Sequence, residues 1–322
     1  MRVLVLHSDV APDAPPEEMD TLLTARAIAD ALTARGHKAV LAPFAPSLDA
    51  LRATLAGTEP DVVFNMVERA LGQDQLAAIA PAFLEQLGVP CTGNGAAAIL
   101  ATGDKPFSKQ VLRGAGLATP DWCEPPHWRR LKDGARYIVK SATEDASLGL
   151  DDGAVVTGAD AVKARAKASA ARHGGRWFAE AFIEGREFNI SVLEESGVFT
   201  VLPVPEIRFV GWPEGKVRIV GYEAKWNDDS LESTHSVRHF GVEREEPELA
   251  AILAELSKQA CALFAVRGYA RVDFRVDETG VPLILELNPN PCLDPAAGFA
   301  TAAAEAGISY GDVLERILRN AC

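Results

Sequence analysis

The stretch RVDFRVDETGVPLILELNPN, residues 271–290, is the most constraining feature of this sequence. Polar and apolar residues alternate over 271–276 and again over 283–288, and the turn-forming residues 277–280 lie between the two runs. Alternation with a period of two is typical of a β-strand with one polar and one apolar face. Two such strands joined by a glycine-containing turn predict a β-hairpin.

The polar face of this hairpin gathers chemically useful side chains. If the turn is centred just after Thr279, Asp273 lies opposite Glu286 and Arg271 lies opposite Asn288. Directly opposed side chains have Cβ atoms about 5 Å apart, and like charges at that distance are destabilising. A divalent cation such as Mg²⁺ would compensate, because it takes carboxylate and amide oxygens together with substrate phosphates.

A simpler interpretation of the same residues is an ordinary solvated hairpin. In that case Arg271 and Arg275, on the same face, neutralise the acids. The hairpin alone does not separate the two interpretations, so the rest of the chain must decide.

Composition narrows the protein class. With 322 residues and 48% hydrophobic residues, the chain is long enough for two or three hydrophobic cores. A formal net charge of −13 disfavours a nucleic-acid partner. The five cysteines form no CxxC pair, and neither a signal peptide nor a membrane-length apolar run is found. We therefore expect a cytoplasmic protein without a nucleic-acid or membrane partner.

The first hundred residues alternate strand and helix patterns. Such an order predicts βαβ units around a parallel sheet. No GxGxxG or P-loop follows the first strand, which disfavours those nucleotide sites. The expected strands are 2–6, 38–43 and 61–67, and the expected helices are 17–35, 48–56 and 76–87.

The middle of the chain carries a candidate phosphate site. Lys140 ends a predicted strand, 137–140, and a loop of small residues that includes Ser147 follows it. A lysine charge beside backbone N–H groups that oxygens can approach is what a phosphate needs. Helices are expected from 104 to 114 and from 160 to 172, and two strands are expected around the turn Glu184-Gly185.

The last part is predicted to be rich in β-structure over 201–222 and helical over 246–264 and 311–320. Between these parts, the polar segment EAKWNDDSLESTH has no periodic apolar face. A long polar segment of this kind suits a mobile active-site loop.

Six segments together resemble the ATP-grasp ligases, and within them the D-alanine–D-alanine ligase branch. In chain order they are TGDKPFSKQVLRGAGLATP, YIVKSATEDASLGL, FAEAFIEGREF, YEAKW, ARVDF and ILELNPNP. The resemblance implies an α/β, three-domain ATP-grasp fold with α+β elements. It comprises an N-terminal parallel-sheet domain (1–103), a central ATP-grasp subdomain (104–187) and a C-terminal subdomain with the metal site (188–322).

The same resemblance assigns roles to individual residues. Arg271, Lys225 and Ser147 would be catalytic, and Asp273, Glu286 and Asn288 would hold two Mg²⁺ ions. ATP would contact Lys105, Lys140, Ser147, Glu180, Ala181, Ile183, Glu187 and Lys225. The implied reaction phosphorylates a carboxylate, after which an amine attacks the acyl phosphate and an amide forms.

The sequence departs from the family where substrates would bind. The acceptor-binding serine of those ligases aligns with Ala297, and Asp294 lies three residues before it. We therefore expect amino-acid-like small-molecule substrates, with Glu68 and Asp294 contacting them and with poor synthesis of D-alanyl-D-alanine. The alternatives are a genuine D-alanine–D-alanine ligase, an ATP-grasp phosphotransferase and a non-catalytic nucleotide-binding protein. The resemblance also allows a homodimer.

Overall fold

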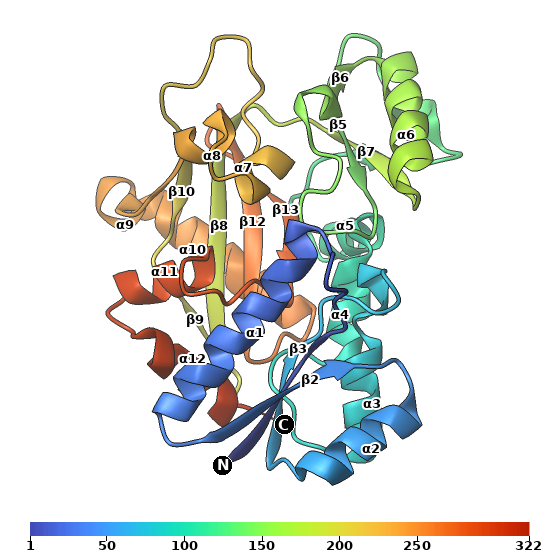
Figure 1. Ribbon diagram of the computed structural model, residues 1–322. Coiled ribbons are helices and arrows are strands. Elements are labelled where there is room, and N and C mark those ends of the chain that lie inside the picture. Colours follow the sequence, from blue (N-terminus) through green and yellow to red (C-terminus); the bar gives the residue numbers. More distant parts are fainter. Residues whose placement is uncertain (322) are drawn as a thin grey trace.

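The computed structural model describes residues 1–321, without the side chain of Arg129. Within that part the chain forms three β-sheets of three, four and six strands. Figure 1 shows the first sheet at the lower right, the four-stranded sheet at the upper right and the six-stranded sheet at the left. Helices pack between and around them.

The N-terminal sheet is parallel, as its βαβ pattern predicts. β1 (Arg2–Ser8) lies between β2 (Lys38–Phe44) and β3 (Val62–Met66). Residues such as Val3 and Val5 pack toward α1 (Pro16–Ala34), whereas Leu4 and Leu6 pack with Leu51 of α2 (Leu48–Thr58) and Leu84 of α3 (Ile79–Leu87). β1 and β3 are therefore buried on both faces, which explains their nearly continuous apolar sequence, whereas the edge strand β2 is largely exposed up to Phe44. A 3₁₀ turn (Asp74–Leu76) precedes α3.

The four-stranded sheet is antiparallel and carries the phosphate-loop candidate. Its order is β4 (Trp122–Cys123), β7 (Trp177–Ala181), β5 (Arg136–Ser141) and β6 (Val155–Thr157). One face packs on α6 (Ala159–His173), through Val162 and Ala166. Short 3₁₀ turns span Trp128–Arg130 and Asp152–Ala154.

The six-stranded sheet contains the hairpin that the sequence predicts. Its strands are β8 (Gly185–Glu195), β9 (Val198–Val201), β10 (Glu206–Phe209), β11 (Ser236–His239), β12 (Tyr269–Asp277) and β13 (Pro282–Asn288). The order is β11-β10-β8-β12-β13, and β9 pairs with β8. The helices α4 (Ala96–Gly103), α5 (Lys105–Gly114), α9 (Val242–Glu245), α10 (Pro247–Leu263), α11 (Gly298–Glu305) and α12 (Tyr310–Arg319) complete this half.

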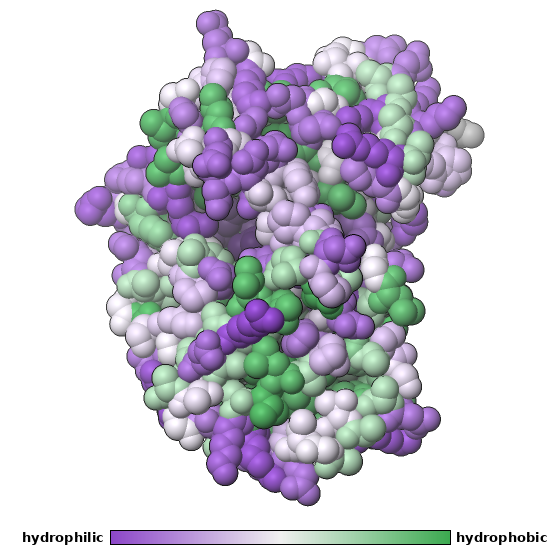
Figure 2. All heavy atoms as spheres, viewed as in Figure 1, coloured by the Kyte–Doolittle hydropathy of each residue, from purple (hydrophilic) through white to green (hydrophobic). Residues whose placement is uncertain are grey.

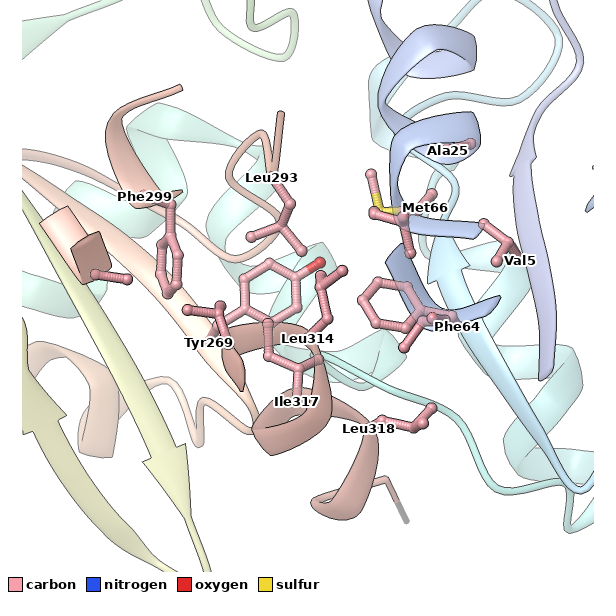
Figure 3. Packing of buried hydrophobic residues seen from close by; sticks show 14 of the residues in the cluster. Val5, Ala25, Phe64, Met66, Tyr269, Leu293, Phe299, Leu314, Ile317 and Leu318 are labelled. Atoms are coloured by element: carbon pink, nitrogen blue, oxygen red, sulfur yellow. The ribbon is translucent and has the colours of Figure 1, made fainter. Parts of the chain in front are cut away.

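A shared hydrophobic core joins the first sheet to the last. Phe64 of β3, Tyr269 of β12 and Phe299 of α11 belong to one cluster, together with Leu314 and Ile317 of α12. Figure 3 shows these side chains converging between the two halves. Because about 25 cal/mol of stabilisation accompanies each Å² of apolar surface removed from water, this core holds the N-terminal sheet against the C-terminal one.

The structure adds detail to four expectations about elements. The two strands expected around Glu184-Gly185 are present as β7 and β8, and they belong to different sheets. The change of sheet therefore falls between residues 181 and 185, so a domain boundary after residue 187 lies inside β8. Of residues 202–222, only β10 forms a strand. The expected mobile loop instead holds two short helices, α7 (Tyr222–Trp226) and α8 (Leu231–His235).

The start of the predicted central subdomain also packs elsewhere. α5 contacts β13, and Leu112 of α5 lies in the core of the six-stranded sheet. α4 and α11 were not predicted at all. Within residues 1–321, no helix is both long and apolar enough to cross a membrane.

Candidate active site

A cavity of about 790 Å³ lies where the three sheets face one another. Figure 2 shows mainly hydrophilic residues over α7 and α8, at the top of the view, with a hollow beneath them. Every site residue that the sequence predicts lines this cavity: Glu68, Lys105, Lys140, Ser147, Glu180, Ala181, Ile183, Glu187, Lys225, Arg271, Asp273, Glu286, Asn288 and Asp294. A smaller hollow of about 260 Å³, beside Glu85 and Arg267, contains none of them.

The hairpin register is the predicted one at the cavity end. Asp273 pairs with Glu286 and Arg271 pairs with Asn288. The centre of the turn, however, lies half a residue earlier in the sequence than predicted. One extra residue in β13, a β-bulge at Leu285, shifts the register and restores the predicted pairing of Asp273 with Glu286. A bulge inserts one extra residue and re-aims the strand, so it sets which face Glu286 presents.

Arg271 already neutralises one of the two facing carboxylates. Its Nε donates to Asp273 Oδ1 at 2.7 Å, and its Nη2 donates to Oδ2 at 2.8 Å. A bidentate guanidinium–carboxylate pair is among the stronger charge-assisted contacts in proteins. Arg275 does not take part in this pair, because its Nη2 lies 3.0 Å from Glu187.

Glu286 lies at the centre of a positive field. Burial opposes its charge, but Lys105, Lys140, Arg271 and Lys225 together lower the pKa of Glu286 to about 2. The net field at this carboxylate is therefore attractive to negative charge, which is the field that polyphosphate oxygens need.

Asp145, which the sequence did not single out, forms an ion pair with Lys105. Lys105 Nζ donates to Asp145 Oδ1 at 2.7 Å and to the Glu144 carbonyl at 3.0 Å, and Glu286 lies 4.0 Å away. Burial raises the pKa of Asp145, even though the charge of Lys105 opposes that rise. The loop is tied to the first domain as well, because the Asp145 N–H donates to Asp74 Oδ2 at 2.8 Å.

Glu180 belongs to a buried triad with two lysines. Its Oε1 lies 3.0 Å from Lys140 Nζ, and its other oxygen contacts Lys109. Burial favours the neutral carboxyl, but the two ammonium groups outweigh it and lower the pKa of Glu180. Lys109 also donates to Thr119 Oγ1 and to the Leu285 carbonyl, both at 2.9 Å, so it holds the β-bulge in place.

The short helices α7 and α8 close one side of the cavity. Tyr222 donates to Glu17 Oε2 of α1 at 2.7 Å, and Trp226 Nε1 donates to the Ala146 carbonyl at 2.9 Å. Lys225, between them in sequence, is accessible to solvent. Partial burial in the cavity and the charge of Arg271 nevertheless lower its pKa. The segment therefore bridges the first domain and the phosphate loop.

The predicted phosphate loop, residues 141–150, has an unusual backbone at Ser147. Ala146 and Ser147 have φ angles of 55° and 60°, in the left-handed region that non-glycine residues rarely occupy. Ser147 Oγ donates to the Val220 carbonyl at 3.2 Å. Strained backbone of this kind is concentrated at ligand-binding loops, where surrounding contacts maintain it.

An acidic group of side chains lines the opposite end of the cavity. Thr21 Oγ1 donates to Glu68 Oε2 at 2.8 Å, and burial is the main cause that raises the pKa of Glu68 to about 7. Burial, with a contribution from Asp294, also raises the pKa of Asp20. Asp294 Oδ1 accepts from the Ala296 N–H at 2.8 Å.

The part of the chain that builds most of this cavity matches a known protein family. The family model described as "D-ala D-ala ligase C-terminus" matches residues 130–319, more than half of the chain. The chain belongs to the D-alanine–D-alanine ligase family. It is an ATP-dependent, ADP-forming ligase of the ATP-grasp type that acts on small amino-acid substrates.

Individual members of the D-alanine–D-alanine ligase family are similar over most of their length. The D-alanine–D-alanine ligase of Cupriavidus necator is 30% identical over 303 residues, which cover 92% of this chain and 86% of that one. The enzyme of Methylococcus capsulatus is 32% identical over 263 residues, 80% of this chain and 78% of its own. The Bacillus anthracis ligase, solved in complex with ATP, superposes with a TM-score of 0.76 at 20% identity, covering 99% of this chain and 97% of that one.

The predicted substrate end of the cavity includes Ala297, which the sequence aligns with the serine of the resembled ligases. Ala297 immediately precedes α11 and provides no side-chain cap. Thr301, which could have replaced the missing hydroxyl, donates to the Ala297 and Gly298 carbonyls of its own helix at 3.0 and 3.1 Å.

The structure also adds cavity-side residues that the sequence reasoning missed. Lys109 does not line the cavity itself but contacts Glu180, which does. It lies four residues after Lys105 on the same helix face, and that spacing could have revealed it. Asp145 lies within the predicted phosphate loop and could have been flagged for its charge. Asp20, Asp74 and Arg238 lie in separate segments, and no local pattern connects them with the site.

Proposed function

We propose that this enzyme joins the carboxylate of one amino acid to the amine of a second, using ATP and releasing ADP and phosphate. The observation that carries the proposal is the convergence of the hairpin carboxylates with Lys105, Lys140, Lys225 and Arg271 in one cavity. Six segments resembling the ATP-grasp ligases contribute to that cavity in the family's order.

We assign the nucleotide to the side of the cavity formed by the phosphate loop and the β7–β8 connection. Lys105 and Lys140 would contact the α- and β-phosphates, Ser147 and its loop the terminal ones, and Lys225 the γ-phosphate. Ala181 and Ile183 would meet the adenine and Glu187 the ribose. Lys105 Nζ already donates to Asp145 and to the Glu144 carbonyl, and its third N–H would be available to a phosphate oxygen.

The donor set suits Mg²⁺. Asp273, Glu286 and Asn288 present oxygen atoms on one face, and magnesium prefers oxygen ligands that include carboxylates and phosphates. Arg271 contacts both oxygens of Asp273, and Asn288 Oδ1 accepts from the Asn290 N–H at 2.8 Å, so each group keeps a further lone pair for an ion. Two bound Mg²⁺ ions would offset the charge that spreads over the transferred phosphoryl group.

The protein residues account for the remaining chemistry. The substrate carboxylate attacks the γ-phosphorus, the bond to the ADP oxygen breaks, and an acyl phosphate and ADP result. The amine then attacks the acyl carbon, phosphate departs and the amine loses a proton. Arg271 would stabilise the tetrahedral oxyanion between these events, a role worth about 3 to 4 kcal/mol for comparable donors.

Glu68 and Asp294 would hold the ammonium end of a substrate. Both line the cavity, and neither carboxylate forms an ion pair within residues 1–321. Burial raises the pKa of Glu68, and the positive charge of a nearby ammonium group would lower that pKa again.

The activity for which the relatives are named, D-alanine–D-alanine ligation, is the main alternative for this chain. Ala297 in place of a hydroxyl favours a different second substrate. A phosphotransferase is a further alternative, in which the phosphorylated group is the product. Hydroxylamine traps an acyl phosphate as a hydroxamate, so it distinguishes phosphorylation of a carboxylate from phosphorylation of a hydroxyl. Identification of the final product then separates a ligase, which forms an amide, from a phosphotransferase.

The deciding experiment measures ADP release with Mg²⁺, ATP and an amino-acid library, with mass spectrometry of the products. An amide product is expected, with D-alanyl-D-alanine formed poorly. Asp273→Asn should abolish turnover, whereas Glu278→Gln, an exposed change in the same hairpin, should not. ATP with Mg²⁺ should also raise the melting temperature as its concentration increases. Absence of both ADP release and this stabilisation would refute the proposal.

We place the enzyme in the cytoplasm, acting without a nucleic-acid or membrane partner. The net charge of −13 and the free thiols of Cys123, Cys261 and Cys292 support this placement. Light scattering at micromolar concentration would distinguish a monomer from the homodimer that the resemblance allows.

A further inference from the structure

Four arginines line the cavity within the described residues, and Arg238 differs from the other three. Arg69 pairs with Asp74, Arg271 with Asp273, and Arg275 with Glu187. Among residues 1–321, no carboxylate lies within ion-pair distance of Arg238. Its hydrogen bond to Thr301 is a long one, 3.3 Å from Nη1 to Oγ1.

The backbone fixes where this unpaired charge lies. Arg238 belongs to β11, whose partner β10 sets the register Ile207 to Arg238. The guanidinium covers Gly298, the first residue of α11: a Cβ at Gly298 would lie 3.4 Å from Nη2. This position is directly beside Ala297, where the family's hydroxyl is missing.

The electrostatics around Arg238 favour an anion. Arg238 is exposed to solvent, yet partial burial and the charge of Arg271 both lower its pKa, so two guanidinium groups of the same cavity repel each other. Like charges in a shared cavity are stabilised when an anion binds between them. Lys225, another cavity cation with no ion pair in the described part of the chain, is already assigned to the γ-phosphate.

We propose that Arg238 binds the carboxylate of the second, amine-bearing substrate and makes the enzyme select amino acids over simple amines. This inference rests on the proposed ligase function and refines it. A guanidinium from β11 then takes the place of the hydroxyl that the resembled ligases have at the position of Ala297.

The test compares each amine that supports ADP release with its carboxamide, beginning with D-alanine and D-alaninamide. The wild type should prefer the free acid. Arg238→Gln should raise KM for the acid at least about tenfold, since a charge-assisted contact is lost, while KM for the amide stays within about twofold. Arg238→Lys keeps the charge but loses the planar fork, so it should give an intermediate KM.

Arg244→Gln is the matched control. Arg244 follows Arg238 by six residues, its side chain is 82% exposed, and it does not line the cavity. Its KM values should equal those of the wild type, and KM for ATP should be unchanged in all variants. An unchanged preference for the acid in Arg238→Gln, or a wild type that prefers the amide, would overturn this inference alone. Absence of ADP release with every substrate would refute the proposed function instead.

Discussion

Replacing Glu286 by glutamine tests which electrostatic effect dominates the hairpin. Two effects oppose each other at this residue. Asp273 directly opposite is a like charge, and such cross-strand pairs are unfavourable by about 0.2 to 1 kcal/mol. Against this, four surrounding cations lower the pKa of Glu286 from 4.5 to about 2.

The magnitudes decide the sign. A shift of about 2.5 pH units corresponds to about 3 kcal/mol of preference for the ionised form. The side chain is 26% exposed, and solvent screening reduces that preference to about 2 kcal/mol. Glu286→Gln should therefore lower the free energy of unfolding of the ligand-free protein by about 2 kcal/mol at pH 7. This reverses the sequence-based expectation that removing one of two facing carboxylates relieves repulsion.

Urea unfolding at several pH values measures this difference. Because the pKa of Glu286 is lowered in the folded state, its stabilising contribution is present above pH 4.5 and is lost as the pH falls toward 2. The gap between wild type and variant should narrow over that range. Glu278→Gln in the exposed turn should leave the stability unchanged. A Glu286→Gln protein as stable as wild type at pH 7, or more stable, would refute the reasoning.

Three further perturbations follow from the site. Lys109→Met should lower the unfolding free energy by about 3 kcal/mol in urea titrations, because Glu180 loses a buried cation and keeps only its second lysine; an equally stable variant would contradict this. Burial raises the pKa of Glu68 to about 7, so its contribution to stability is present below pH 4.5 and is lost as the pH rises through 7. Melting curves recorded from pH 4 to 8 should show this loss for the wild type and not for Glu68→Gln. Tyr222→Phe removes the contact with Glu17 and should speed proteolysis within residues 222–235 in the absence of ATP, and unchanged cleavage would show that the contact does not restrain this segment.

Local pattern was sufficient to predict the hairpin face. Alternation with a period of two determines which side chains share a face, and by itself it groups Arg271, Asp273, Glu286 and Asn288. The parallel N-terminal sheet was predictable for a similar reason, since buried parallel strands carry continuous apolar runs. Motif order then indicated the family, because six segments in sequence are far more specific than one.

Tertiary structure decided the partners of those side chains. The bulge at Leu285 is held by Lys109 from α5, which is 176 residues away in sequence. β7 and β8 are adjacent in the chain, yet they belong to different sheets. The apolar face of β8 packs on α10, in a core that contains no residue of β7. Arg238 on the edge strand β11 likewise reaches Gly298 and Thr301 of α11, about sixty residues further along the chain. Contacts between distant segments depend on how the sheets pack, and local periodicity carries no information about that packing.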